Sequence, residues 1–506
     1  MDADLVIRNA LVVTASDVWP RSDIAIKGGT IIAVGSHLAV QTGVEEIDAE
    51  GAHVTPGGID SHVHLSQWWN PGPGEPQKTI PTDGTIPNLA KFTGDTYETG
   101  SRSAIAGGTT TILSFALQFQ DDESIIPVIE EYHKLAAGQS YCDYAFHVIV
   151  TNPTQRVLEE EFPVMVDKYG ITSIKVYMTY AALKLSDYQI LDVLYAARKS
   201  GITTMVHAEN ADVVEWMTGQ LEKKGLFAPH YHGLSRPPLV EAEATNRVIS
   251  LSELMDTPIL LVHVSSELAA ATVRNAQTRL LPVHAETCPH YMYLLADKMR
   301  AKGFEGAKWV CSPPLREDSA DLDAIWRGLR NGTFTTVSSD HAPDSFHHPN
   351  GKQRCLGDAD HPHGKFKDIP NGLPGLETRM PLLFEGVLDG KITPQKFVEL
   401  TASNPAKLYG LQKKGSIAPG YDADLAIWYP KGGIPSFQLS NEMLHHRIDY
   451  TPYEGKQFRN WVRYTILRGK LVFREGQVVG DTSDGVYVKR GRSTLAGPQN
   501  VWAEWR

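Results

Sequence analysis

The sequence has few cysteines and no long apolar segment. Its four cysteines, Cys142, Cys288, Cys311 and Cys355, have no short regular spacing, so a disulfide framework is not predicted and a reducing compartment is indicated. The N-terminus lacks the basic start and apolar block of a signal peptide. No stretch approaches the roughly 18 apolar residues of a membrane span. We therefore expect a cytoplasmic protein with no membrane partner.

The sequence also lacks an excess of basic residues. Its 48 Lys and Arg face 59 Asp and Glu, for a formal net charge of −11. Because no basic stripe could follow a phosphate backbone, nucleic acid is not expected as a partner. The 42% hydrophobic and 21% charged content is ordinary for a globular protein with a sizeable core. These values favour a folded protein that acts on small molecules.

Both ends of the sequence show the same strand pattern. Residues 1–52 alternate apolar and polar positions around a tight Lys27-Gly28-Gly29 turn, and residues 415–480 repeat this texture. We expect the two flanks to pack as one small β-sandwich domain. Residues 53–414 would form a larger domain between them, and residues 481–506 a C-terminal tail.

The central region alternates short β-branched runs with helical patterns, as in βαβ units with a parallel sheet. Eight such strands predict a closed (β/α)₈ TIM barrel of the α/β class. The alternative is an open doubly wound sheet, but no Gly-x-Gly-x-x-Gly follows a strand here. The predicted strands are residues 53–64, 109–116, 144–151, 173–179, 203–209, 258–265, 281–289 and 334–342.

Metal-ligand residue types recur at the ends of these strands. In a TIM barrel, the carboxyl ends of the strands form the active site. His62 and His64 stand two residues apart, so in a strand they share a face and could hold one ion. Barrel closure would bring the other strand-end residues to the same mouth, which raises this pair from a weak signal to a metal site. These residues are Lys175, His207, His263 and Asp340.

Eight motifs carry a specific family resemblance. They are "GGIDSHVHL", "GITSIKVYMTY", "MVHAEN", "LLVHVSS", "AETCPHYM", "VCSPPLR", "SSDHAP" and "IPNGLPGLETRMPLL". In order and spacing, from about residue 3 to 480, the chain resembles the amidohydrolase superfamily, in detail its dihydropyrimidinase and hydantoinase branch. The resemblance implies two Zn²⁺ ions per subunit. One is held by His62, His64 and Asp340, the other by His207 and His263, with carboxylated Lys175 and a hydroxide as bridges.

The same resemblance implies a reaction on a cyclic amide. The bridging hydroxide would attack the ring carbonyl, Tyr180 and one zinc would stabilise the oxyanion, and Asp340 would carry the proton to the leaving ring nitrogen. Ser312 and Asn371, otherwise ordinary loop residues, would present mainly backbone groups to the ring. His341 would support Asp340 or its neighbours. The product would be an N-carbamoyl amino acid, and the assembly a homotetramer with segment 451–461 reaching a neighbour.

Other activities stay open to different degrees. A dihydroorotase is disfavoured, because that family has an arginine where this chain has Ser66. An allantoinase remains an alternative, although it would lack the "PNGLPG" context. Neuronal relatives of dihydropyrimidinase keep the fold as non-catalytic scaffolds and lose the ligands. All six ligand positions are filled here, so an enzyme is favoured over a scaffold.

Two segments depart from the family pattern. Residues 66–97 form an insertion in which Trp68 and Trp69 either cover the pocket or pack on a neighbouring subunit. Residues 345–368 form a polar insertion with four histidines whose spacing resembles no compact ligand set, so a further metal site is not favoured. Both insertions leave the substrate open. The four histidines are His347, His348, His361 and His363.

Overall fold

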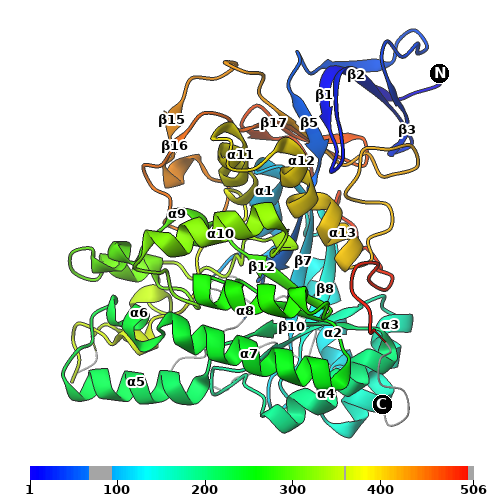
Figure 1. Cartoon of the computed structure of the whole chain (residues 1–506). Coiled ribbons are helices and arrows are strands. Elements are labelled where there is room, and N and C mark those ends of the chain that lie inside the picture. Colours follow the sequence, from blue (N-terminus) through cyan, green and yellow to red (C-terminus); the bar gives the residue numbers. More distant parts are fainter. Residues whose placement is uncertain (68–93, 358–359, 500–506) are drawn as a thin grey trace.

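The computed structural model describes residues 1–67, 94–357 and 360–499 (Figure 1). At its centre is an eight-stranded sheet in which neighbouring strands are parallel and follow one another in chain order. Its strands are β6 (Gly58–Val63), β7 (Thr109–Leu117), β8 (Asp143–Ile149), β9 (Ser173–Tyr177), β10 (Thr203–His207), β11 (Ile259–Leu261), β12 (Val283–Thr287) and β13 (Thr336–Val337).

The first and last strands of this sheet meet beyond the end of β13. A parallel bridge joins Val63 to His341, and the amide of His64 donates to the carbonyl of His341 at 2.8 Å. These contacts bring the two edges of the sheet together as a barrel. The predicted (β/α)₈ fold is therefore confirmed, and the open doubly wound alternative is wrong.

Amphipathic helices cover the outside of the barrel. Figure 1 shows α4 (Asp187–Ser200), α7 (Pro238–Met255), α8 (Glu267–Thr278) and α10 (Ser319–Asn331) side by side along one flank. The start and stop signals of α4 are local. Ser186 caps its N-terminus by accepting from the amide of Gln189, and Gly201 ends it at a φ of 69°. Other helices of the barrel are α1 (Tyr97–Ala106), α2 (Ile126–Ala136), α3 (Phe162–Asp167), α5 (Ala211–Lys223), α6 (Tyr231–Ser235) and α11 (Arg379–Leu388).

The interior of the barrel is filled with apolar side chains. Ile59, Leu113, Phe115 and Met205 are buried there from three different strands. Tyr409, which directly follows α13 (Asn404–Leu408), is buried in the same cluster. Because this part of the interior is a packed core, the open space for a substrate is expected at the carboxyl ends of the strands.

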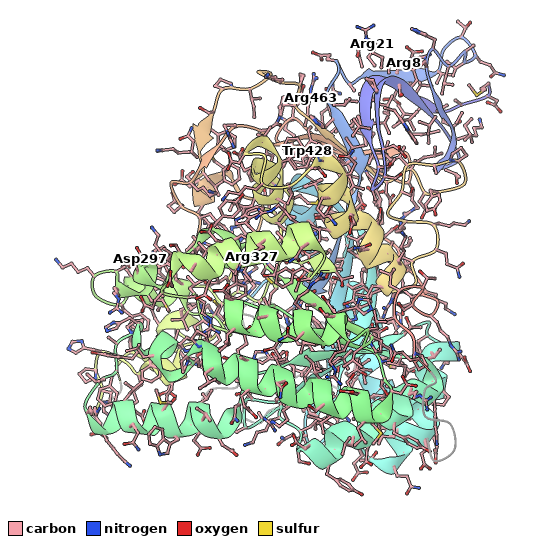
Figure 2. The ribbon with its side chains drawn as sticks, in the orientation of Figure 1. Arg8, Arg21, Asp297, Arg327, Trp428 and Arg463 are labelled. Carbon is pink, nitrogen blue, oxygen red and sulfur yellow. The ribbon has the colours of Figure 1, made fainter. Side chains whose placement is uncertain are left out.

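A separate mixed sheet is built from both ends of the chain (Figure 1). Its strand order is β19-β18-β17-β14-β5-β1-β2-β3, with β4 beside β1. Trp428 of β14 is labelled in Figure 2. Its ring stacks on that of Phe384 in α11, with the centroids 4.0 Å apart, and this contact attaches the sheet to the barrel. The strands are β1 (Leu5–Val13), β2 (Val18–Lys27), β3 (Thr30–Gly35), β4 (Glu45–Asp48), β5 (His53–Pro56), β14 (Leu425–Trp428), β17 (Val462–Leu467), β18 (Lys470–Arg474) and β19 (Gln477–Val478).

The structure divides the first predicted barrel strand. Residues 53–56 form β5 of the mixed sheet, and only residues 58–63 form β6 of the barrel. The break falls at Gly57, where an added Cβ would lie 2.2 Å from the Thr110 hydroxyl. Glycine is thus needed where the chain passes from one sheet to the other. The predicted domain boundaries, including the tail from residue 481, stay predictions.

Among the described residues, no helix is both long and apolar enough to cross a membrane. Residues 94–97 of the first insertion lie at the start of α1, whereas Trp68 and Trp69 lie outside the described residues. The proposal that they cover the pocket therefore stays a prediction.

Candidate metal and substrate site

Three of the predicted ligands converge at the mouth of the barrel. Nε2 of His62 lies 3.0 Å from Oδ1 of Asp340, and Nε2 of His64 lies 3.5 Å from the same oxygen. Potential ligand atoms of these three side chains all lie within 4.8 Å of one another. Nζ of Lys175, in the middle of β9, lies 2.7 Å from Nε2 of His62. The end of β6, the middle of β9 and the loop after β13 thus place His62, Lys175 and Asp340 next to one another.

The remaining two predicted ligands adjoin this group. The rings of His207 and His263 lie 4.4 Å apart between centroids, and the ring of His263 lies 5.5 Å from that of His62. His207 is the last residue of β10, and His263 follows β11 by two residues. The structure therefore brings all six predicted ligands to one mouth.

Several of these residues have unusual backbone conformations. His263 has a φ of 42°, Asp340 of 46° and Tyr180 of 67°. Non-glycine residues with positive φ are uncommon, and holding one costs about 1–3 kcal/mol, which the surrounding structure must supply. Such strain gathers at functional sites. Here it falls on three residues to which the sequence assigned a role.

Burial sets the protonation of the cluster. It lowers the pKa of His64 to about 4, with Asp340 opposing, and holds the pKa of His263 well below its usual range. Burial also lowers the pKa of Lys175 to about 8, against Asp340 and Glu286. For Asp340, burial raises the pKa, but His62 and His64 hold it well below the usual range of a carboxyl group. For His62, burial and Lys175 lower the pKa, but Asp340 and Glu286 outweigh them and raise it above its usual value. His64 and His263 thus have the neutral form in which imidazoles ligate metals, and Asp340 has the charged form of a carboxylate ligand.

Two of the imidazoles, those of His62 and His64, are each oriented by a second side chain that has no signal of its own in the sequence. Nδ1 of His62 lies 2.6 Å from Oε1 of Glu286, and Nδ1 of His64 lies 2.8 Å from Oε1 of Gln67. These contacts place a proton on Nδ1 and leave Nε2 facing the cluster, as in metal sites where an acceptor fixes the histidine tautomer. Glu286 stands in the "AETCPHYM" motif and Gln67 in the loop after His64, but neither has a spacing signal of its own.

His207 is held by the opposite nitrogen. Its Nε2 lies 2.7 Å from Oε2 of Glu209, which also accepts from Nη1 of Arg236 at 3.0 Å. Burial raises the pKa of Glu209, but Arg236 and His207 bring it down to about 2. Glu209 is therefore a carboxylate, and Nδ1 of His207 remains for a cation.

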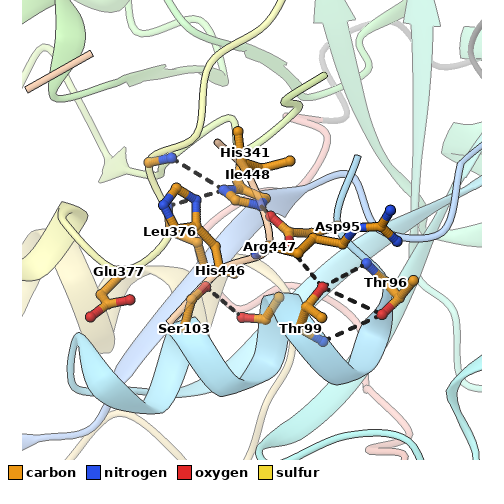
Figure 3. Close-up of polar contacts among 12 residues, drawn as sticks. Asp95, Thr96, Thr99, Ser103, His341, Leu376, Glu377, His446, Arg447 and Ile448 are labelled. Carbon is orange, nitrogen blue, oxygen red and sulfur yellow. Dashed lines mark hydrogen bonds and ion pairs between the residues drawn. The ribbon is translucent and has the colours of Figure 1, made fainter. Parts of the chain in front are cut away.

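His341 lies beside the cluster, as expected, and is fixed from both sides (Figure 3). Its Nε2 faces Oδ2 of Asp95 at 2.9 Å, while Nδ1 accepts from the amides of Gly375 and Leu376 at 3.1 and 3.3 Å. Asp95 also accepts from the amide of Arg447 at 3.0 Å. Because the His341 carbonyl accepts from the amide of His64, this network ties the Asp340 loop to the strand of the first two ligands.

The three predicted substrate residues lie together next to His207. Nδ2 of Asn371 donates to the hydroxyl of Tyr180 at 3.2 Å, and the rings of Tyr180 and His207 lie 5.4 Å apart. Burial raises the pKa of Tyr180, with Arg236 opposing, so its hydroxyl keeps its proton. Oδ1 of Asn371 is a buried polar atom with no hydrogen-bond partner, and the buried side chain of Ser312 interacts with the hydroxyl of Tyr180. A cavity of about 410 Å³ adjoins Asn371 and Arg236.

The cluster fits a metal centre on chemical grounds. It offers buried nitrogen and oxygen donors without thiolate, a set suited to zinc. Nδ1 of His263 is buried without a hydrogen-bond partner. Another acidic group, Asp143, Asp422 and Asp424, already surrounds the ammonium of Lys414 at 2.6–3.1 Å. Within the described ranges, the four histidines of the second insertion join no potential metal-binding group.

Comparison with known proteins gives one consistent family. Residues 53–472 match the amidohydrolase family. Over 489 residues the chain is 39% identical to a D-hydantoinase of Ralstonia pickettii, which covers 96% of this chain and 99% of the relative. A D-hydantoinase of Geobacillus stearothermophilus is 39% identical over 499 residues, with 98% of each chain covered. The crystal structure of a dihydropyrimidinase from Brevibacillus agri superposes with a TM-score of 0.86 at 39% identity, covering 97% of this chain and 99% of that chain.

Proposed function

Because the chain belongs to the amidohydrolase family, we propose that it opens the ring of a cyclic amide to give an N-carbamoyl amino acid. The substrate class is a dihydropyrimidine or a 5-substituted hydantoin, in keeping with the names of its relatives. The observation that carries the proposal is the meeting of six ligand-type side chains with Tyr180 and Asn371 at one barrel mouth.

Two zinc ions are the proposed cofactor. His62, His64 and Asp340 would hold one, and His207 and His263 the other. An ammonium cannot ligate a cation, but the buried amine of Lys175 could capture CO₂ and release a proton, and the resulting carbamate would supply two oxygen ligands for the metal centre. Zinc supplies Lewis-acid polarisation of the ring carbonyl and a nucleophile derived from water at neutral pH.

The side chains around the cluster would carry out the remaining steps. The hydroxyl of Tyr180, held by Asn371 at 3.2 Å, donates to the oxygen of the attacked carbonyl as negative charge develops. Asp340 accepts the proton of the attacking water and passes it to the ring nitrogen as the carbon–nitrogen bond breaks. Backbone groups of Ser312 and Asn371 hold the ring in register with that carbonyl.

A parallel assay of the zinc-loaded enzyme tests this function. Dihydrouracil, 5-phenylhydantoin, allantoin and dihydroorotate are compared as substrates, and we expect turnover of one of the first two. Allantoin as the sole substrate would favour the allantoinase alternative, and turnover of none would favour a non-catalytic scaffold. The same resemblance proposes a homotetramer, which the mass of the protein in solution tests.

Replacing the proposed bridge tests the metal centre. We expect Lys175→Ala to lower kcat/KM by roughly 10³-fold or more and to lose at least one of the two bound zinc ions. Lys199→Ala, at an exposed lysine of α4, serves as the control and should retain both activity and metal. Retention of full zinc content and turnover by Lys175→Ala would refute the bridging role.

A further inference from the structure

A second buried lysine lies in the insertion at residues 345–368. Lys352 begins the short 3₁₀ helix η5 (Lys352–Cys355) and is fully buried, with 0% of its surface exposed. Its Nζ donates three hydrogen bonds of 2.8 Å each, to the carbonyls of Val310, Pro370 and Gly372. An ammonium has three N–H donors, so every proton of this group is committed to a backbone carbonyl.

These carbonyls belong to the two loops of the proposed substrate site. Val310 precedes Ser312 by two residues, whereas Pro370 and Gly372 stand on either side of Asn371. A direct bond also joins the loops, because the amide of Gly372 donates to the carbonyl of Val310 at 3.1 Å. The ammonium of Lys352 therefore crosses from one loop to the other at the positions that set their separation.

Stability alone does not account for a charge at this position. Burying an ammonium carries a desolvation cost of several kcal/mol, and an apolar residue of similar volume would often serve packing equally well. Burial lowers the pKa of Lys352 to about 8, with Asp344 opposing. What the charge provides, and a hydrocarbon cannot, is simultaneous attraction for three carbonyls from two loops.

We propose that Lys352 is a positioning residue that fixes the separation of the two loops so that their peptide groups meet opposite edges of the substrate ring. This inference rests on the proposed function, in which Ser312 and Asn371 bind that ring. The insertion at residues 345–368 would then contribute to substrate affinity, because it contains the lysine whose ammonium group joins the two substrate loops.

The test compares two substitutions in η5, each of which removes one positive charge. Lys352→Met keeps an unbranched side chain of similar volume, one atom shorter, but donates no hydrogen bond. Arg354→Met is the matched control, since Nε of Arg354 donates to the carbonyl of Asp368 at 3.2 Å and contacts neither loop carbonyl beside Ser312 or Asn371. We measure kcat, KM and zinc content with the best substrate of the parallel assay.

We expect Lys352→Met to raise KM about tenfold or more, to change kcat by a smaller factor, and to keep full zinc content. Arg354→Met should stay within about twofold of the wild type in KM. Lys352→Gln, which keeps two N–H donors, should fall between the wild type and Lys352→Met. If Lys352→Met does not fold, the intermediate KM of Lys352→Gln carries the test.

Two outcomes separate this inference from the proposed function. A wild-type enzyme that opens none of the rings would overturn the proposed function, and the inference with it. An active wild type with unchanged KM in both Lys352 variants, or an equal KM shift in Arg354→Met, would overturn the inference alone. Zinc loss in Lys352→Met would also overturn it, because the effect would then lie in the metal centre.

Discussion

The metal half and the substrate half of the site are held in place by different kinds of structure. The metal half comprises the six predicted ligands, on strands or within a few residues of their ends, and its imidazoles are oriented by side-chain acceptors such as Glu286 and Glu209. The substrate half comprises Tyr180, Ser312 and Asn371, all on loops. Its loops are joined by backbone bonds and by Lys352.

This difference indicates where each half is vulnerable. Metal ligation depends on particular side-chain atoms, so a change of one atom at a ligand or its acceptor should lower metal affinity or activity. Ring binding through peptide groups depends on where the backbone lies. Substitutions that leave the backbone in place should therefore be tolerated in the substrate half, whereas loss of the anchor at Lys352 should not.

The largest contrast is expected between Asp340→Asn and Ser312→Ala. Asp340→Asn keeps the shape of the side chain but removes the base that carries the proton, so we expect kcat to fall by roughly 10³-fold or more. Ser312→Ala removes a hydroxyl that lies beside Tyr180 but leaves the backbone unchanged, so kcat/KM should stay within about fivefold. Steady-state kinetics and zinc content of both purified variants provide the measurement.

A loss of activity in Ser312→Ala as large as that in Asp340→Asn would contradict this division. In that event the hydroxyl of Ser312 itself would contact the reacting atoms. Near-normal kcat in Asp340→Asn would remove Asp340 from the proton path and leave it as a ligand only.

Within the metal half, Glu286→Gln tests whether the acceptors matter as well as the ligands. The amide oxygen of Gln can still accept from Nδ1 of His62, but the negative charge that raises the basicity of the ring is gone. We expect zinc affinity or activity to fall about 10–100-fold. Competition with a chelator measures the affinity, and Glu130→Gln, at a half-exposed glutamate of α2, is the control. Unchanged affinity in Glu286→Gln would limit its part to packing.

The metal half was more accessible to sequence reasoning than the substrate half. His62 and His64 alternate at a strand end, and the other ligands recur at later strand ends, so barrel topology alone predicts that they meet. Tyr180, Ser312 and Asn371 were assigned only through the family resemblance, because loop residues have no periodicity that indicates where they lie. The sequence pattern predicts all eight barrel strands. It extends the first of them across Gly57, where the structure has two separate strands.

The residues that support the site were not predictable from spacing. Glu286 and Gln67 act through contacts with histidines 224 and 3 residues away, and nothing in their local sequence marks them. Lys352 lies in a polar insertion in which the four histidines, and not the lysine, are the residues that suggest a site. Its role depends on two loops that meet only in the folded chain. The sequence therefore predicts the ligand residues on the strands better than the residues that hold the substrate loops in position.

The smallest effect is expected at Asp95, which contacts no ligand and acts through His341 (Figure 3). Burial raises its pKa, but the hydrogen bond with His341 holds the pKa well below the usual range. The unfolded chain takes up this proton near pH 4, and the folded chain only at lower pH. The stabilisation is therefore present above about pH 4 and is lost as the pH falls further.

We expect Asp95→Asn to lower the free energy of unfolding by about 1–3 kcal/mol at pH 7, with kcat/KM reduced less than tenfold. The difference from the wild type should shrink as the pH falls below 4, because Asp95 of the unfolded wild-type chain then becomes protonated and unfolding is favoured by that proton uptake. Denaturant unfolding of the two proteins from pH 7 to pH 3 measures this. A gap that stays constant over that range would mean that Asp95 acts through its shape and not its charge. A loss of activity as large as that of Asp340→Asn would instead place Asp95 and His341 inside the metal half, because the network would then govern the ligand itself.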